Sequence, residues 1–104
     1  MEQGASSADI SVVIRYFNDA QTIHRALESV RLALPRAEQI VVDDGSDRAL
    51  GELDGVLVLR QANSGPGAAR NLGASHATRD WMIFLDADDV LCTSISRALP
   101  LLAG

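Results

Sequence analysis

The chain has 104 residues, of which 47% are hydrophobic, and it contains no apolar run long enough to span a bilayer. This composition predicts one soluble globular unit. The formal net charge of −5 excludes partners that are bound through surplus lysine and arginine, so we expect neither nucleic acid nor an anionic membrane surface to be a ligand.

The N-terminal residues 1–9 are small and polar. They lack the basic start and the apolar middle of a secretory signal peptide, so we expect a flexible N-terminus and a cytoplasmic protein. Cys92 is the only cysteine and cannot form an internal disulfide, which is typical of a reducing cytoplasm. We interpret Cys92 as a small core residue and residues 10–104 as one domain.

The first predicted strand covers residues 10–14, a β-branched and nearly continuous apolar run. Such a run is typical of a strand that is covered on both faces in a parallel sheet. Asn18, with Gln21 three residues later, is expected to cap a helix that ends at Pro35. Apolar residues recur in this helix at the spacing of one face, namely at Ile23, Leu27, Val30 and Leu34. The polar residues between them are interpreted as a solvated face, and His24 is given no catalytic role.

Residues 40–42 form a second predicted strand, which ends in Asp43-Asp44-Gly45-Ser46. A third strand is predicted over residues 56–59. The connection 47–55 is short and polar, too brief for a full crossover helix, so we expect a loop or a single helical turn there.

A second helix is predicted from Pro66 to about Ala77, because proline is tolerated at the first helical position, where its missing N–H costs nothing. Ala69, Leu72, Gly73 and His76 share one face of this helix. The small residues on that face are expected to let the helix lie close to the sheet.

The fourth predicted strand covers residues 81–85 and leads into the acidic segment 86–89, and a last helix is predicted over residues 94–102. The resulting order, β-α-β-β-α-β-α, indicates an α/β fold with a Rossmann-like, mostly parallel sheet flanked by helices. Acidic residues follow the second and the fourth strands. Because ligands of open α/β sheets bind beyond the carboxyl ends of the strands, both acidic groups are expected to share one crevice.

The acidic segment after the fourth strand is a candidate metal site. Asp86 and Asp88 lie two residues apart, so in an extended chain their carboxylates point to the same side and can meet one hard divalent cation that bridges to diphosphate oxygens. The simpler interpretation is that Asp86, Asp88 and Asp89 only form a turn and cap the next helix. Three neighbouring acids repel one another, which favours the cation.

The other polar segments allow two interpretations each. Asp43-Asp44-Gly45-Ser46 is ordinary turn chemistry, or one of its carboxylates accepts hydrogen bonds from the edge of a base or a sugar. The segment 65–67 at the start of the second helix can offer backbone N–H groups to a phosphate. Arg70, one turn along, either adds positive charge to a nucleotide site or is a surface cation.

Four segments in this order resemble the inverting family 2 glycosyltransferases, whose N-terminal half carries the nucleotide-diphospho-sugar site. The resemblance covers residues 10–91. The segments are Ser11-Val12-Val13-Ile14 with Phe17-Asn18, then Ile40-Val41-Val42-Asp43-Asp44-Gly45-Ser46, then Asn63-Ser64-Gly65 with Ala69-Arg70-Asn71-Leu72-Gly73, and finally Phe84-Leu85-Asp86-Ala87-Asp88-Asp89.

The resemblance implies the nucleotide-binding half of a GT-A fold. Such a domain holds a nucleotide-diphospho-sugar, with a UDP-sugar favoured, for transfer to the hydroxyl of a sugar or lipid-linked acceptor. By resemblance, Asp44 contacts the nucleobase in a pocket lined by Arg15 and Phe17. Asp86 lies near the ribose or the metal, and Asp88 is the main protein ligand of Mg²⁺ or Mn²⁺.

The chain also departs from the family pattern. Family members usually carry proline where this chain has Arg15, which leaves the base preference open. They tend to have more residues after Gly45-Ser46, so we expect a trimmed loop. The family places its acceptor site and general base in a C-terminal half that is not in this chain. We therefore expect a truncated domain without a catalytic base, inactive alone, that self-associates through an open strand edge or by exchange of a terminal helix between two copies.

Two other classes of protein remain as alternatives. The first is a non-catalytic module that binds a nucleotide or a metal, as a degenerate or inactive truncated copy of the enzyme. The second is a phosphotransfer domain such as a receiver or a phosphatase. This second class is disfavoured, because its key aspartate would follow the first strand, where Arg15-Tyr16-Phe17 stands.

Overall fold

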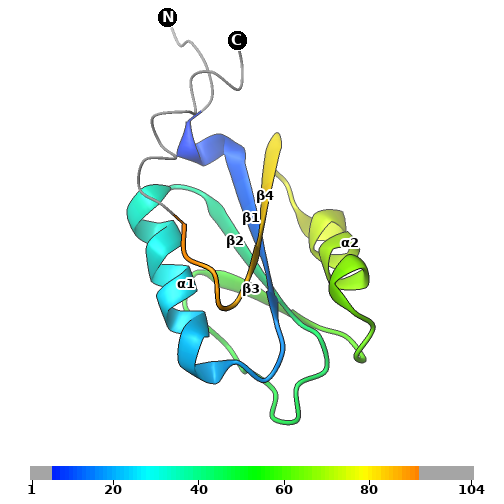
Figure 1. Cartoon of the computed structure of the whole chain (residues 1–104). Coiled ribbons are helices and arrows are strands. Elements are labelled where there is room, and N and C mark those ends of the chain that lie inside the picture. Colours follow the sequence, from blue (N-terminus) through cyan, green and yellow to red (C-terminus); the bar gives the residue numbers. More distant parts are fainter. Residues whose placement is uncertain (1–5, 92–104) are drawn as a thin grey trace, which may run out of the picture.

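The computed structural model describes residues 6–91, which form a parallel sheet with one helix on each face (Figure 1). Cys92 and the helix predicted over residues 94–102 lie outside the described residues. Within them, neither helix is long and apolar enough to cross a membrane. After a short 3-10 turn at Ser7–Asp9, the elements are β1 (Ile10–Tyr16), α1 (Ala20–Ala33), β2 (Glu38–Asp43), β3 (Val56–Arg60), α2 (Pro66–His76) and β4 (Trp81–Asp86).

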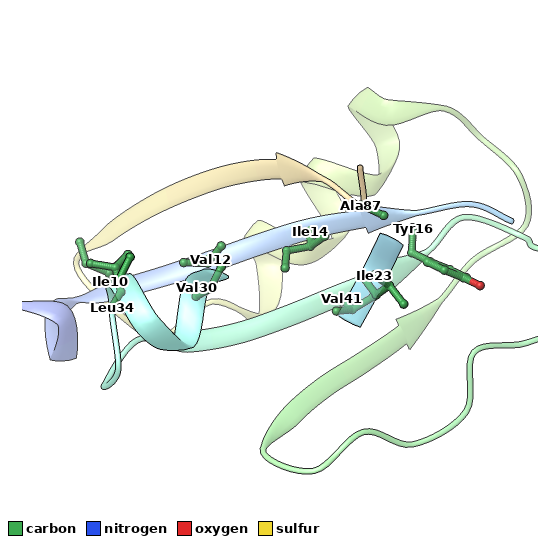
Figure 2. Packing of buried hydrophobic residues seen from close by; sticks show 10 residues of the cluster. Ile10, Val12, Ile14, Tyr16, Ile23, Val30, Leu34, Val41 and Ala87 are labelled. Carbon is green, nitrogen blue, oxygen red and sulfur yellow. The ribbon is translucent and has the colours of Figure 1, made fainter. Parts of the chain in front are cut away.

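The strands pair in the order β3-β2-β1-β4, and every pair is parallel. β1 is central, and its apolar run is buried as predicted from its β-branched residues. On the α1 face the core joins β1 residues such as Val12 and Ile14 to Ile23 and Val30 of the helix (Figure 2). A smaller cluster around Val13 lies on the α2 face. The predicted α/β architecture is therefore confirmed.

The start of α1 differs from the prediction. Asp19, not Asn18, is the N-cap residue, and it makes no side-chain capping bond. Asn18 instead adopts a left-handed backbone conformation with φ of 52°. Its backbone N–H donates to Ser46 Oγ at 2.8 Å and its Oδ1 accepts from the Asp47 backbone N–H at 2.9 Å. Asn18 thus joins the loop after β1 to the loop after β2, and this tertiary role replaces the expected cap.

The face of α1 that the sequence marks as polar is indeed exposed, including His24. The buried side of the helix consists of Ile23, Ala26, Val30 and Ala33. Leu27 is only half-buried, while Leu34 is buried at the C-cap. The expected apolar stripe is therefore correct in direction, with alanines completing it.

Residues 44–55, which connect β2 to β3, contain no helix. The connection bends back only at an isolated antiparallel bridge between Leu53 and Val56. Of the two forms expected for this segment, the loop is the one observed. Without a crossover helix here, α1 is the only helix among residues 6–91 that packs on its face of the sheet.

α2 packs directly on β1 at Gly73, which has no side chain. A Cβ at this position would come within 2.3 Å of Val13 Cγ1. Ala69 is buried beside Gly73, and Leu72 packs against the same cluster. His76 does not continue this face, because it is exposed in the last turn, with its Nδ1 3.2 Å from the Leu72 carbonyl oxygen.

Among residues 6–91, β4 is the edge strand of the sheet, and its two faces are covered to different degrees. Ile83 and Leu85 pack against the core on the α1 side. Trp81, Met82 and Phe84 are 37%, 46% and 41% exposed. α2 packs mainly against β1 and β2, so within residues 6–91 the side of β4 that carries Met82 and Phe84 is the less covered one. The apolar sequence of this strand predicts the strand itself but not the exposure of one face.

Candidate functional site

The carboxyl ends of the strands bring the predicted polar residues to one edge of the sheet, as parallel pairing requires. Arg15 in β1 is in register with Val42 of β2 and with Asp86 of β4. Asp44 follows β2 directly, and Gln61 follows β3 directly. The strand ends gather the two acidic groups at one edge of the sheet, but they do not share one crevice, because Asp43 and Asp44 are buried and do not line the pocket beside Asp86 and Asp88.

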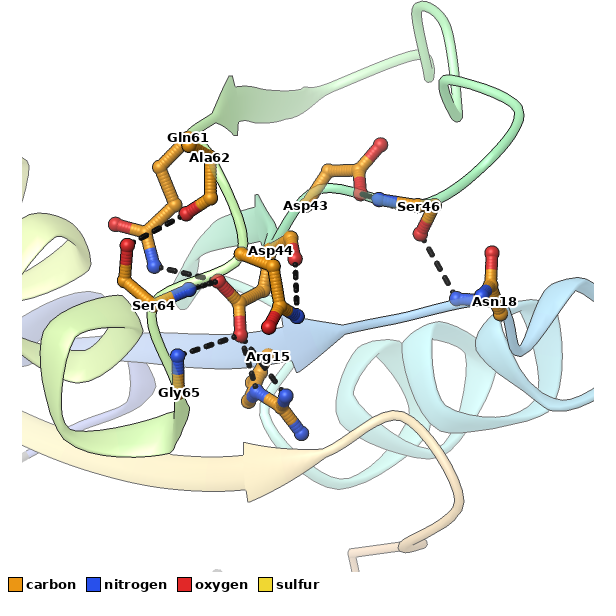
Figure 3. Close-up of polar contacts among 10 residues, drawn as sticks. Arg15, Asn18, Asp43, Asp44, Ser46, Gln61, Ala62, Ser64 and Gly65 are labelled. Carbon is orange, nitrogen blue, oxygen red and sulfur yellow. Dashed lines mark hydrogen bonds and ion pairs between the residues drawn. The ribbon is translucent and has the colours of Figure 1, made fainter.

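Asp44 is the centre of this edge, with a fully buried side chain. Its Oδ1 accepts hydrogen bonds from Gln61 Nε2 and the Ser64 backbone N–H, both at 2.8 Å. Its Oδ2 accepts from the Gly65 backbone N–H at 3.1 Å, and from Nε and Nη2 of Arg15 at 3.1 and 2.9 Å. Figure 3 shows these donors around the carboxylate. We refer to these five residues as the Asp44 cluster.

The electrostatics of the cluster favour the ionised form of Asp44. Burial alone would raise the pKa of this carboxyl group, but the hydrogen bonds from Gln61, Ser64, Arg15 and Gly65 outweigh burial and hold the pKa at about 2. Both oxygens are occupied by protein donors. The role of Asp44 as the base-contacting residue stays a prediction, and in the described arrangement its carboxylate has no exposed surface to offer a ligand.

Asp43 has a different partner set from its neighbour. Its Oδ1 accepts from the Ser46 backbone N–H at 2.9 Å. Its Oδ2 accepts from the Leu50 backbone N–H at 3.2 Å and from Arg60 Nη1 at 2.8 Å. Burial opposes ionisation, but these hydrogen bonds and the charge of Arg60 lower the pKa of Asp43. Asp43 therefore stabilises the helix-free loop after β2.

Arg15 is the link between the Asp44 cluster and the acidic residues after β4. Its side chain is 24% exposed, and its guanidinium carbon lies 5.7 Å from the centre of the Phe17 ring. The two hydrogen bonds to Asp44 hold the guanidinium in place, and the Phe17 ring lies within the range of a cation–π contact. Arg15 thus places a positive charge at the edge of the sheet between the Asp44 cluster and Asp86.

The residues 86–89 form what we call the acidic turn. One carboxylate oxygen from each of Asp86, Asp88 and Asp89 lies within 4.8 Å of the others, and all three residues are exposed. Asp89 also has a structural role, because its Oδ2 accepts from the Asp86 backbone N–H at 3.1 Å and its own N–H donates to the Asp86 carbonyl oxygen at 2.9 Å. The segment is therefore a turn whose carboxylates lie close together, and a bound cation stays a prediction.

A cavity of about 200 Å³ joins these features. We call it the Arg15 pocket, and its walls are Arg15, Phe17, Asp19, Asp86, Ala87 and Asp88. Two larger hollows, of about 360 and 390 Å³, lie along α1 and the 47–56 region. Neither of them contains the acidic turn or Arg15, so their size does not make them the stronger candidates. The chemistry is concentrated in the smaller pocket.

Not every predicted site residue reaches this pocket. Arg15, Phe17, Asp86 and Asp88 line it, whereas Asp44 touches it only through Arg15. Arg70 is exposed on α2 and is not part of the pocket wall.

The start of α2 also has less capacity for a phosphate than the sequence indicates. The Gly65 backbone N–H is already bonded to Asp44, and Pro66 has none. Of the segment 65–67, only the Gly67 backbone N–H remains to be offered.

Two residues of the site have no separate place in the sequence-based prediction. Asp19 lines the Arg15 pocket, and Gln61 is a donor to Asp44. Both lie just past the carboxyl end of a strand, where polar residues of a parallel sheet converge. That position is the signal that identifies them.

Comparison with known proteins gives one consistent answer. The sequence model of the family described as Glycosyl transferase family 2 matches residues 11–94. The chain is 39% identical over 92 residues to the pre-mycofactocin glycosyltransferase of Mycobacterium tuberculosis, covering 82% of this chain and 19% of that protein. It is 38% identical over 96 residues to the succinoglycan biosynthesis protein ExoW of Rhizobium meliloti, covering 80% of this chain and 30% of that protein.

Similarity to a solved structure supports the fold. A crystal structure of residues 1–349 of TarS from S. aureus superposes with a TM-score of 0.73 at 24% identity, covering 86% of this chain and 30% of that chain. The chain spans only about 15% to 30% of the length of the curated relatives that it matches.

Proposed function

Because this chain belongs to glycosyltransferase family 2, we propose that it is the donor-binding part of a metal-dependent glycosyltransferase. In this role it holds a nucleotide-diphospho-sugar whose sugar is transferred to the hydroxyl of a sugar or lipid-linked acceptor. The observation that carries the proposal is the Arg15 pocket, in which an arginine, an aromatic ring and the acidic turn meet at the carboxyl edge of the sheet.

The acidic turn fits a divalent cation such as Mg²⁺ or Mn²⁺. Its carboxylates are hard oxygen ligands, and their close spacing allows one ion to contact more than one of them. Their exposure leaves room for water and phosphate oxygens in the remaining coordination positions. Asp86 and Asp88 are the proposed ligands, because Asp89 is engaged by the backbone of Asp86.

Charge explains why binding of the donor would depend on the cation. The pocket wall carries Asp19, Asp86 and Asp88 against a single arginine, so an unaccompanied diphosphate is repelled. Asp86 and Asp88 would hold the cation, which would reverse the local field and supply positive charge to the departing nucleoside diphosphate. Arg15 would then orient the nucleoside end of the nucleotide-sugar through an N–H group. Phe17 would do so through the face of its ring.

An inverting transfer also needs a carboxylate that deprotonates the acceptor hydroxyl. Asp89, the acid next to the proposed metal ligands, already bonds to the backbone of its own turn and is not assigned this role. We therefore assign residues 6–91 to binding of the nucleotide-sugar donor, and we assign no residue among them to deprotonation of the acceptor hydroxyl. A domain that binds the nucleotide and metal without chemistry is the second candidate function, and the engagement of Asp89 is the observation that favours it.

The test is calorimetry of the chain with nucleoside diphosphates in Mn²⁺ and in excess chelator. We expect chelation or Asp88→Asn to weaken binding about tenfold or more, which corresponds to roughly 1.4 kcal/mol. Asp54→Asn, which changes an exposed acid outside the Arg15 pocket, is the matched control and should bind like the parent chain. Affinity that does not change in chelator would overturn the metal-dependent site. Release of sugar from a bound donor onto an acceptor would distinguish an active enzyme from the binding module.

A further inference from the structure

Arg15 has one side of its guanidinium fixed by the protein and another side free for a ligand. Nε and Nη2 both donate to Asp44 Oδ2, at 3.1 and 2.9 Å. Among residues 6–91, Nη1 has no hydrogen-bond partner, and the side chain forms part of the wall of the Arg15 pocket. The edge formed by Nη1 and Nη2 therefore presents N–H donors only.

Asp44 cannot supply a complementary acceptor in this arrangement. Five donors surround its two oxygens, and the side chain has no exposed surface. A base with an N–H group facing this position would meet the N–H groups of Arg15 instead of a carboxylate. At the position of Arg15 the pocket therefore offers N–H donors to a base, while its exposed carboxylates are those of Asp19, Asp86 and Asp88.

We propose that Arg15 determines base specificity in this domain and selects a base that offers two adjacent acceptor atoms. The inference rests on the proposed function, since it concerns the nucleoside of the same donor. Guanine meets the requirement with O6 and N7, which arginine contacts as a bidentate pair. Cytosine meets it with O2 and N3. In uracil an N–H separates the two carbonyl oxygens. In adenine the acceptors N1 and N7 lie on either side of the amino group, so they are not adjacent to each other.

The orientation of the free edge is held before any ligand arrives. Asp44 holds one side of the guanidinium, and the Phe17 ring lies 5.7 Å from its central carbon. Asp86 is the β4 partner of Arg15 in the sheet register, yet no ion pair forms between them. A cation bound to Asp86 and Asp88 would not compete with the base for Arg15. The metal and the base would therefore contact different side chains of one pocket. Under this proposal the domain prefers a GDP- or CDP-sugar, in place of the UDP-sugar that the resemblance favours.

The experiment compares GDP, CDP, UDP and ADP by calorimetry in Mn²⁺ on the 104-residue chain. We expect GDP and CDP to bind about tenfold tighter than UDP and ADP, the discrimination typical of one bidentate contact. Arg15→Met should remove the preference. Arg15→Lys keeps a positive charge for Asp44 but lacks the planar fork, so it should bind all four with similar affinity. Arg36→Met, which changes an exposed arginine at the other end of β2, should keep the preference.

The outcomes separate this inference from the proposed function. If the folded chain binds none of the four nucleotides with metal, the donor site itself is wrong. If nucleotides bind but UDP or ADP equals GDP and CDP, or if Arg15→Lys keeps the preference, the role of Arg15 is wrong while the site stands. Circular dichroism of each variant reports whether it is folded. If Arg15→Met does not fold, the affinities of Arg15→Lys decide whether Arg15 sets the base preference. A purely structural role for Arg15 would change all four affinities together.

Discussion

Asp43 and Asp44 are adjacent in the chain, yet their carboxylates organise different segments. Asp43 accepts hydrogen bonds from the loop after β2 and from Arg60. Asp44 accepts them from the connection between β3 and α2 and from Arg15. Removing Asp44 would leave buried donors without an acceptor, so a loss of ligand binding in Asp44→Ala would not by itself show contact with the base.

The acid sensitivity of the fold should depend on Asp44. Its folded-state pKa of about 2 lies below the value of an unfolded aspartate, so the ionised carboxylate stabilises the fold above about pH 4, and this contribution is lost as the pH falls toward 2. We expect Asp44→Asn to lower the free energy of unfolding by on the order of 2 kcal/mol at neutral pH. Urea unfolding at steps from pH 7 downward should show this difference shrinking below pH 4. A difference that stays constant down to pH 2.5 would contradict it.

At the scale of elements, the sequence predicts most of the fold for identifiable reasons. The apolar runs at residues 10–14 and 40–42 become buried strands, and Pro66 begins a helix. These elements are predictable because each signal comes from residues that are adjacent in the sequence. Contacts between distant segments escape such patterns. Asn18 pairs with the loop after β2, and Arg15 pairs with Asp44 across 29 positions of the chain. The acidic turn is predictable because its residues are adjacent. The pairing with Asp44 that holds Arg15 in the pocket wall is not.

The close approach of α2 to β1 gives a prediction for one glycine. Gly73→Ala would place a methyl group against Val13 in a packed core, so we expect a loss of about 1–3 kcal/mol in the free energy of unfolding. Gly67→Ala is the matched control, because a Cβ there meets nothing within 4 Å and alanine is the better helix former. Denaturant unfolding of the two variants should give opposite signs. Equal stability of Gly73→Ala and the parent chain would show that α2 can move outward freely.

At the scale of the whole molecule, the open side of β4 predicts self-association. β4 has a strand partner on one edge only within residues 6–91, and Met82 and Phe84 expose apolar surface beside it. We expect sedimentation of the 104-residue chain to show concentration-dependent dimers or larger species. Met82→Lys with Phe84→Lys should shift the chain toward monomer. Leu32→Lys, at an exposed leucine on α1, should not. A parent chain that is monomeric at high concentration would refute the role of β4.

The position of β4 also bears on how the site forms and opens. The acidic turn is held in place by β4, which pairs with β1 although the two strands lie at opposite ends of the described chain, whereas the Asp44 cluster depends on β1, β2 and the segment after β3. Local opening of the edge strand would therefore disperse the carboxylates while the cluster persists. Amide hydrogen exchange should then be faster in β4 than in β1, and a cation that binds the turn should slow exchange in β4 selectively.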